Sequence, residues 1–186
     1  MKITFVRHTE VEEKYIGKYN GHIDIALSNN GKKQAKELAN RFKDEKFDKV
    51  YCSDLLRAKE TLEAFNLNVE PIYTKKLREK SWGSDEGKSY DEICKEKDIE
   101  YENFEQWISA LDGENIISYQ KRVKSYFVDV LKKDNSKNIL IVTHSGFIKT
   151  LISIIDGCSL EDAFKINLGY GGVMIYEKGS YYISNY

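Results

Sequence analysis

Short apolar runs with strand character alternate along this chain with segments whose apolar residues follow a helical period. The first run covers residues 1–6, and the most apolar later run covers residues 138–143. Between them, apolar side chains recur at intervals of three and four residues in 28–44, at Ala35, Leu38, Ala39 and Phe42, and again in 118–133. Alternation of this kind is typical of βαβ units. We therefore expect an α/β protein built around a mostly parallel sheet.

A short strand over residues 49–52 precedes the second predicted helix. Ser53 and Asp54 are both residue types that favour the N-cap position, and we expect one of them to open a helix that runs to Phe65. Arg57 then falls in the first turn of this helix.

The remaining elements follow from local signals. The only proline, Pro71, predicts that a strand at 70–74 lies at a sheet edge or begins there. Ser89 and Glu92 have the spacing of a capping box and open a predicted helix toward Lys97. The other predicted elements are a helix at 102–111, a helix at 118–133 with an apolar stripe of Tyr119, Val123, Tyr126, Phe127, Val130 and Leu131, a buried helix at 147–155 ended by Gly157, and two strands within 172–186 joined by a turn at 178–179.

Length and charge limit the classes of protein that this chain can be. The 186 residues suit one domain, predicted over 1–186, that buries about 70% of the surface exposed by its unfolded chain. The 29 lysine and arginine residues nearly cancel the 30 aspartate and glutamate residues. This balance argues against a duplex nucleic-acid binder that depends on excess basic charge, so any anion site is local.

Cysteine usage and hydropathy indicate the compartment. Cys52, Cys94 and Cys158 lie far apart, and none belongs to a Cys-x-x-Cys pair that would indicate zinc or redox chemistry. The first apolar run is interrupted at Arg7, too early for a signal peptide, and no window approaches ~18 uninterrupted apolar residues. We therefore expect a cytoplasmic protein that contacts no membrane.

Two of the three histidines follow directly on the two most strand-like runs. His8 comes after the first run, and His144 comes after the run at 138–143. In an open parallel sheet, ligands bind beyond the carboxyl ends of the strands, where the strand order reverses. The sequence therefore predicts that the two imidazoles face one pocket. We expect no site role for the third histidine, His22.

Five ordered blocks resemble the motifs of the histidine phosphatase superfamily, also called the phosphoglycerate mutase-like family. That family opens with a strand and Arg-His-Gly-Glu, followed by Gly-x-x-Asp-x-x-Leu-Ser/Thr and a Gly-x-x-Gln-Ala helix. The blocks here are 7–10 (Arg-His-Thr-Glu), 21–28 (Gly-His-Ile-Asp-Ile-Ala-Leu-Ser) with 31–35 (Gly-Lys-Lys-Gln-Ala), 53–61 (Ser-Asp-Leu-Leu-Arg-Ala-Lys-Glu-Thr), 77–87 (Leu-Arg-Glu, Trp-Gly and Glu-Gly), and 143–146 (Thr-His-Ser-Gly). Together they make a chance match a poor explanation.

The resemblance implies a three-layer α/β/α fold and phosphoryl transfer without a metal or other cofactor. It also implies a small phosphorylated metabolite as the substrate, and a monomer or homodimer. The short chain is more similar to the small phosphatases of the family, among them α-ribazole phosphatase, than to the longer phosphoglycerate mutases.

The resemblance also assigns roles to five residues. Arg7 and Arg57 bind phosphate, because a planar guanidinium can hold two phosphate oxygens at once. His8 is the nucleophile that carries the phosphoryl group. His144 hydrogen-bonds the transferring oxygens. Glu79 gives a proton to the leaving group and then takes one from the attacking water.

Three positions depart from the family pattern. Thr9 stands where most members have glycine, Val11 where they have Thr or Ser, and Lys14 where they have Asn. We expect Thr9 and Lys14 to supply substitute contacts to phosphate, and Asn20 and Ser145 to complete the phosphate site.

The expected activity is hydrolysis of a small phosphomonoester, with α-ribazole phosphate among the candidates. The alternatives are a phosphoglycerate mutase-type phosphotransferase and a catalytically weak protein that binds a phosphorylated ligand. The resemblance assigns recognition of the leaving group to a variable segment at about 80–120. Within it, Glu86, Tyr90, Tyr101 and Trp107 are the candidates to line the substrate site. The alternative is that Trp107 and Tyr101 pack a lid of helices on the sheet.

Overall fold

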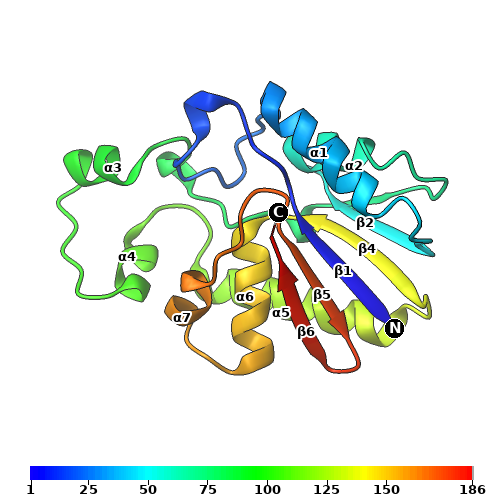
Figure 1. Ribbon diagram of the computed structural model, residues 1–186. Helices are drawn as coiled ribbons and strands as arrows, with labels where there is room; N and C mark the ends of the chain where they lie inside the picture. Colours follow the sequence, from blue (N-terminus) through cyan, green and yellow to red (C-terminus); the bar gives the residue numbers. More distant parts are fainter. Residues whose placement is uncertain (186) are drawn as a thin grey trace.

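One six-stranded sheet organises the computed structural model, which describes residues 1–185 (Figure 1). The strand order is β3-β2-β4-β1-β5-β6. The pairs β1–β4, β2–β4 and β2–β3 are parallel, whereas β1–β5 and β5–β6 are antiparallel. The strands are β1 (Lys2–Arg7), β2 (Lys49–Ser53), β3 (Ile72–Thr74), β4 (Asn138–Thr143), β5 (Val173–Glu177) and β6 (Ser180–Ser184). The predicted mostly parallel sheet and its edge strand after Pro71 are confirmed.

Helices cover both faces of this sheet (Figure 1). The α-helices are α1 (Asn29–Arg41), α2 (Leu56–Glu63), α3 (Tyr90–Glu96), α4 (Phe104–Ala110), α5 (Ile116–Lys133), α6 (Ser145–Asp156) and α7 (Leu160–Lys165). Short 3-10 helices occur at η1 (Glu13–Tyr15), η2 (Lys75–Leu77) and η3 (Gly83–Asp85). Within residues 1–185, no helix is both long and apolar enough to cross a bilayer.

Alternating strand residues divide the core into two layers. Leu140 and Val142 of β4 pack with Leu38 of α1 and Leu62 of α2 on one face. The neighbouring positions of β4 and β1 point the other way, toward the apolar stripes of α5 and α6. Successive strand residues face opposite sides of a sheet, so a continuous apolar run serves both layers. The predicted stripe of α5 is confirmed at Tyr119, Val123, Tyr126, Phe127 and Val130, while the side chain of Leu131 lies outside the described part.

Most predicted boundaries agree with the structure within a few residues. The Ser89–Glu92 capping box opens α3, and Gly157 ends α6 in the left-handed conformation, with φ 67°. The final hairpin turns at Lys178 and Gly179, and its predicted last residue, Tyr186, lies outside the described residues. The short helix α7 was not predicted, because its six residues are too few for a clear helical period.

The expected cap of α2 is wrong. Neither Ser53 nor Asp54 caps this helix, whose N-cap residue is Leu55. The N–H of Leu56 instead donates to Oδ1 of Asp24, at 2.7 Å, and Asp54 is held in an ion pair with Arg78. A residue more than thirty positions earlier in the chain therefore supplies the acceptor. Arg57 does lie in the first turn, as predicted.

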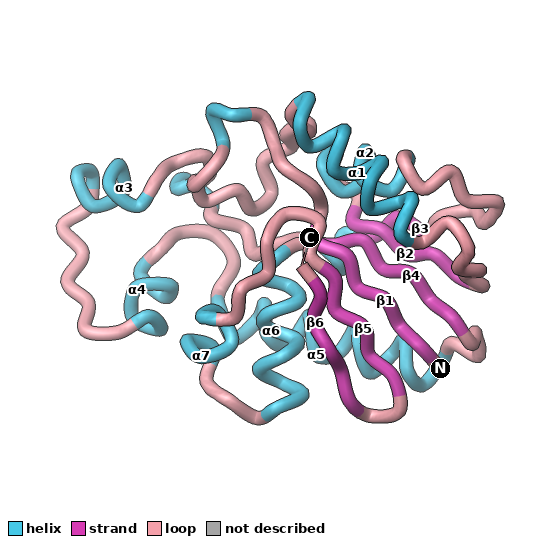
Figure 2. Tube along the Cα trace, viewed as in Figure 1, coloured by secondary structure: helices cyan, strands magenta, loops and turns pink. Residues whose placement is uncertain are grey.

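The paired strands β1 and β4 end side by side. Arg7 is in register with Thr143, and the N–H of His8 continues the ladder by donating to the carbonyl of Thr143 at 2.9 Å. Both strands end at this point, and loops gather beyond it (Figure 2). Helices α3 and α4 project from this end of the molecule, away from the sheet (Figures 1 and 2).

Candidate active site

The imidazole rings of His8 and His144 meet at the carboxyl ends of β1 and β4. Their centroids lie 5.2 Å apart, with an interplanar angle of 61°. His8 is 7% exposed and His144 is fully buried. The structure therefore brings together two histidines that are 136 positions apart in the sequence, because their strands are neighbours in the sheet.

Hydrogen bonding selects one tautomer of His8. Its Nδ1 lies 2.8 Å from the carbonyl oxygen of Thr9, which can only accept, so Nδ1 carries the proton. Burial, together with the positive charges of Arg57 and Arg7, lowers the pKa of His8 well below its ordinary value. A neutral ring protonated at Nδ1 leaves a lone pair on Nε2. This nitrogen is a potential nucleophile.

His144 has the opposite arrangement. Its Nε2 lies 2.8 Å from Oγ of Ser53, and its buried Nδ1 has no partner among the described residues. Burial, followed by the charge of Arg57, lowers the pKa of His144 well below its ordinary value. When the Ser53 hydroxyl donates to Nε2, the ring proton of the neutral imidazole is on Nδ1. This N–H can then donate a hydrogen bond to a ligand.

Arg7 and Arg57 bring two positive charges to the rings, and Arg7 is half-buried. Arg57 is fully buried, and burial lowers its pKa to about 10, so it remains charged at neutral pH. Its Nη1 donates to the carbonyl of Ile23 and its Nη2 to those of Asn20 and Gly21. Both Nη atoms of this predicted phosphate-binding guanidinium therefore donate to backbone carbonyls. The Nε of each arginine is buried without a partner in residues 1–185.

Neither arginine forms an ion pair with a described carboxylate. Arg7 donates to the carbonyl of Leu168 at 2.6 Å, and its guanidinium lies 4.2 Å from the ring centroid of Tyr170. A buried charge without a counterion is costly, so such sites usually have an anionic ligand. The unpartnered N–H groups of both arginines and of His144 are suited to an oxyanion.

A cavity of about 250 Å³ opens beside this cluster. It is lined by four of the predicted site residues besides Arg7, namely His8, Asn20, Glu79 and Ser145. Arg57 and His144 are fully buried and lie deeper in the protein, so they are not part of its wall. Its apolar wall comes from Val11, Tyr19, Trp82, Ile108, Ile116, Leu160, Phe164 and Tyr170.

Three donors hold the carboxylate of Glu79 at the cavity. Tyr119 OH donates to Oε1 at 2.6 Å, and the N–H of Lys80 donates to the same oxygen at 3.0 Å. The N–H of Gly146, in the first turn of α6, donates to Oε2 at 2.7 Å. A negative charge at a helix N-terminus is favourable. Burial and the Glu79 charge raise the pKa of Tyr119 well above its ordinary value, so its hydroxyl keeps its proton.

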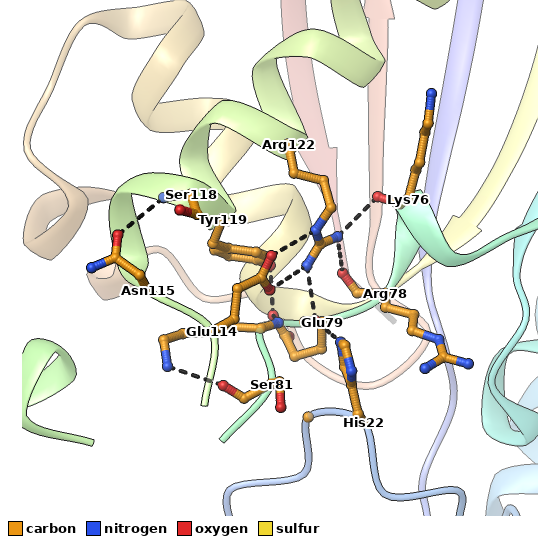
Figure 3. A network of polar contacts seen from close by, with 12 residues as sticks. His22, Lys76, Arg78, Glu79, Ser81, Glu114, Asn115, Ser118, Tyr119 and Arg122 are labelled. Carbon is orange, nitrogen blue, oxygen red and sulfur yellow. Dashed lines mark hydrogen bonds and ion pairs between the residues drawn. The ribbon is translucent and has the colours of Figure 1, made fainter. Parts of the chain in front are cut away.

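Arg122 positions the backbone that carries Glu79 (Figure 3). Its guanidinium donates to the carbonyls of Lys76, Arg78 and Glu79 and forms an ion pair with Glu114 at 2.6 Å. The ring of His22 also reaches the Glu79 carbonyl, at 3.1 Å (Figure 3). Sequence reasoning missed Tyr119 and Arg122 because their partners lie about forty positions away.

Thr9 and Lys14, also expected at the phosphate, do not line this cavity either. The hydroxyl of Thr9 lies against Thr61 Oγ1, at 3.3 Å, where α2 passes beneath the loop. Lys14 is 70% exposed and pairs with Glu12 at 3.5 Å, because the 3-10 helix η1 carries it outward. Thr9 instead has a structural contact, since Thr61 accepts from its N–H and donates to the carbonyl of Arg57.

The side chain of Glu86 organises a loop and does not line the cavity. Its carboxylate accepts from the N–H groups of Gly21, His22, Ile23 and Trp82, at 2.7–3.2 Å. Tyr90 and Tyr101 pack on Trp107, with ring centroids 4.9 and 5.0 Å away. These aromatic residues therefore pack against one another and do not line the cavity.

No group of three or more His, Cys, Asp and Glu side chains within residues 1–185 is arranged to hold a metal ion. The candidate site is thus defined by imidazoles, guanidinium groups and one carboxylate.

Both site histidines are expected to stay neutral in mildly acidic solution. Their pKa values are lowered well below the ordinary 6.5, so on acidification each ring takes up a proton only well below that pH. The pKa of His22 is lowered too, by partial burial, but less strongly. With three histidines in the chain, NMR of histidine-labelled protein resolves each ring, and single replacements assign them. Titration of His8 or His144 at or above pH 6.5 would contradict this geometry.

The fold and site define an α/β protein with two facing histidines at the carboxyl edge of its sheet. Residues 3–182 match the sequence model of the histidine phosphatase superfamily (branch 1). This chain belongs to that superfamily.

Relatives and solved structures agree with this assignment. Phosphoserine phosphatase 1 of Hydrogenobacter thermophilus is 31% identical over 171 residues, covering 87% of this chain and 79% of the relative. The adenosylcobalamin/alpha-ribazole phosphatase of Salmonella typhimurium is 30% identical over 158 residues, covering 82% of this chain and 78% of the relative. The structure is also similar to phosphoserine phosphatase from Entamoeba histolytica in complex with 3-phosphoglyceric acid, with a TM-score of 0.81 and 28% identity. The match covers 99% of this chain and 95% of the other.

Proposed function

We propose that this protein is a phosphatase that hydrolyses a small phosphomonoester through a phosphohistidine on His8. One observation carries the proposal: two facing imidazoles lie beside the buried Arg57 and the half-buried Arg7, and neither guanidinium forms an ion pair with a described carboxylate. Membership of the histidine phosphatase superfamily, and relatives named as phosphatases, support the same reaction class.

In the first step, Nε2 of His8 attacks phosphorus. A nitrogen–phosphorus bond forms as the bond to the leaving oxygen breaks, and Arg7 and Arg57 neutralise the phosphoryl oxygens. The Nδ1–H of His144 donates to one of these oxygens. Glu79, protonated at this stage, gives its proton to the leaving alkoxide.

In the second step, water attacks the phosphohistidine. Glu79, now ionised, takes a proton from the water as the new oxygen–phosphorus bond forms. The nitrogen–phosphorus bond breaks, inorganic phosphate leaves, and His8 returns to its neutral form. The Thr9 carbonyl keeps the imidazole proton on Nδ1 throughout.

The cavity favours a small leaving group. Its volume of about 250 Å³ lies below the range of roughly 300–1,000 Å³ that is usual for drug-sized ligands. The segment at about 80–120 contributes Lys80, Trp82, Ile108 and Ile116 to the wall, which supports its role as the substrate cover. Both α-ribazole phosphate and phosphoserine remain candidates from the names of relatives, and the small volume favours phosphoserine.

The three cysteines support a reducing compartment. Cys52, Cys94 and Cys158 are all free thiols, and Cys52 is buried. We place the reaction in the cytoplasm on this ground.

A phosphomonoester panel measured in EDTA tests the function. The panel contains p-nitrophenyl phosphate, O-phosphoserine, 3-phosphoglycerate and α-ribazole 5′-phosphate, and kcat/KM is obtained from phosphate release. Release from at least one substrate is the expected result. Transfer between phosphoglycerates without phosphate release would instead identify a mutase-type phosphotransferase. Binding without turnover would identify a phospho-ligand-binding protein.

Replacing Gly146 with alanine is expected to lower kcat by about 10²-fold, because small misplacements of reacting groups have effects of that order. A Cβ at this position would lie 2.2 Å from Oε1 of Glu79 and displace the carboxylate. Alanine is otherwise favourable within a helix, so the fold should persist. Steady-state kinetics and thermal unfolding separate the two effects. A folded Gly146→Ala enzyme with the wild-type kcat would show that the observed carboxylate position is not needed.

A further inference from the structure

The cavity carries more positive charge than one phosphate requires. Lys18, Lys80 and Lys149 line it together with Arg7, and Glu79 is the single carboxylate on its wall among the described residues. A phosphomonoester brings about two negative charges, which Arg7 and the deeper Arg57 match. The lysines therefore need a separate explanation.

Two of the three lysines have protein partners that explain them. Lys18 forms an ion pair with Glu92 at 3.4 Å. Lys80 Nζ donates to the carbonyls of Ser81 and Asp112, at 3.0 and 3.3 Å, and lies 4.2 Å from the ring centroid of Trp82. Lys80 is also 2% exposed, so it braces the loop after Glu79. Of the three, only Lys149 is neither in an ion pair nor almost fully buried.

Lys149 lies on α6, one turn after Ser145, and is half-buried. Its Nζ donates to the Phe164 carbonyl at 2.8 Å and lies 5.5 Å from the ring centroid of Phe164, and it forms no ion pair with a described carboxylate. An ammonium has three donors, so two remain for a ligand. Burial and the like charge of Arg7 lower the pKa of Lys149, and the opposite charge of Glu79 offsets part of this effect.

We infer that Lys149 binds a carboxylate of the substrate, which makes the substrate class small phosphorylated carboxylic acids. This inference rests on the proposed phosphatase function and deepens it. A carboxylate placed between Lys149 and the phosphate site neutralises the ammonium and satisfies its free donors. A single ammonium on a flexible stem suits a monoanion, whereas the guanidinium pair suits the phosphate dianion.

Position and size support the same ligand. Ser145 and Lys149 occupy one face of α6, because residues four apart lie one above the other on a helix. Ser145 is at the end that carries His144, so Lys149 stands about one helical turn, roughly 5.4 Å, farther along the wall. This separation suits two acidic groups on one short carbon chain. The apolar side chains of Leu160 and Phe164 restrict larger leaving groups.

Matched substrates test the inference. O-phosphoserine has a carboxylate that O-phosphoethanolamine lacks. In the second pair, 3-phosphoglycerate has a carboxylate where glycerol 3-phosphate has a hydroxymethyl group. We expect the wild type to prefer the carboxylate member of each pair in kcat/KM. The Lys149→Met enzyme should lose about 10- to 100-fold more kcat/KM on that member than on its partner, the range for a hydrogen bond to a charged group. Lys149→Arg should restore part of the preference.

Controls separate this inference from the general function. Lys36→Met, at an exposed lysine on α1, should leave the preference unchanged. Equal losses on both members of each pair, or a wild type without preference, would overturn the carboxylate role while p-nitrophenyl phosphate hydrolysis still upholds the phosphatase. Failure to hydrolyse any phosphomonoester would refute both proposals.

Discussion

Replacing His8 with alanine is expected to lower kcat by about 10⁴-fold or more, as loss of a covalent nucleophile does in other enzymes. The unprotonated Nε2 of His8 is the group that we propose forms the bond to phosphorus, and the charges of Arg57 and Arg7 act on this ring. Initial rates with p-nitrophenyl phosphate, measured at saturating substrate, provide the comparison.

His22 offers a matched control for this variant. It is the remaining histidine outside the imidazole pair, and its ring contacts the backbone carbonyl of Glu79 and no reacting position. The His22→Gln enzyme should therefore lose far less activity than His8→Ala. If His8→Ala kept more than about one hundredth of the wild-type kcat while His22→Gln lost more, the assignment of the nucleophile would be wrong.

Replacing Glu79 with glutamine is expected to lower kcat by about 10²- to 10⁴-fold on an alkyl phosphomonoester. The loss should be smaller with p-nitrophenyl phosphate, whose leaving group needs little protonation. Because the second step still needs a base, the variant should accumulate phosphoenzyme with that substrate. Rapid-quench measurement of protein-bound phosphate detects this accumulation.

The contacts of Glu79 require a second variant. Both carboxylate oxygens accept hydrogen bonds, so the amide of glutamine must turn its NH₂ toward a donor. The Glu79→Ala enzyme avoids this conflict, and added formate should partly restore its turnover. Glu161→Gln, at a carboxylate on α7 whose side chain is 44% exposed and pairs with Lys165, controls for loss of charge alone. Equal losses on alkyl and p-nitrophenyl substrates, without phosphoenzyme, would contradict proton transfer by Glu79.

The strand ends could be located from the sequence because they depend on local patterns. The apolar runs that became β1 and β4 each end at a histidine, and parallel neighbours bring those ends together. The positions of His8 and His144 therefore follow from pattern and topology. Arg57 could be placed in the first turn of α2 for the same reason.

The remaining contacts could not be predicted, because they join residues far apart in the chain. Asp24, and not Ser53 or Asp54, accepts from the first turn of α2. Thr9 is beside Thr61, which only the packing of α2 under the loop determines. Lys14 points to solvent because η1 turns it outward. Each of these contacts depends on how loops cross the sheet edge, and no local propensity encodes that path.

The segment at about 80–120 shows the same limit. Its helices α3 and α4 were predicted from capping and periodicity, but their aromatic residues pack against one another around Trp107. The cavity wall includes other residues of that segment, and also Tyr19, Leu160 and Phe164 from parts of the chain outside it. Substrate selection therefore draws on several loops at once, including the unpredicted helix α7.

Trapping the covalent intermediate tests the central claim most directly. Wild-type enzyme is mixed with a ³²P-labelled phosphomonoester, quenched within milliseconds, and digested for peptide mapping. Acid-labile, alkali-stable label on the peptide that contains His8, absent from His8→Ala, is the predicted result. Steady phosphate release with no label on His8 at any quench time would contradict the account.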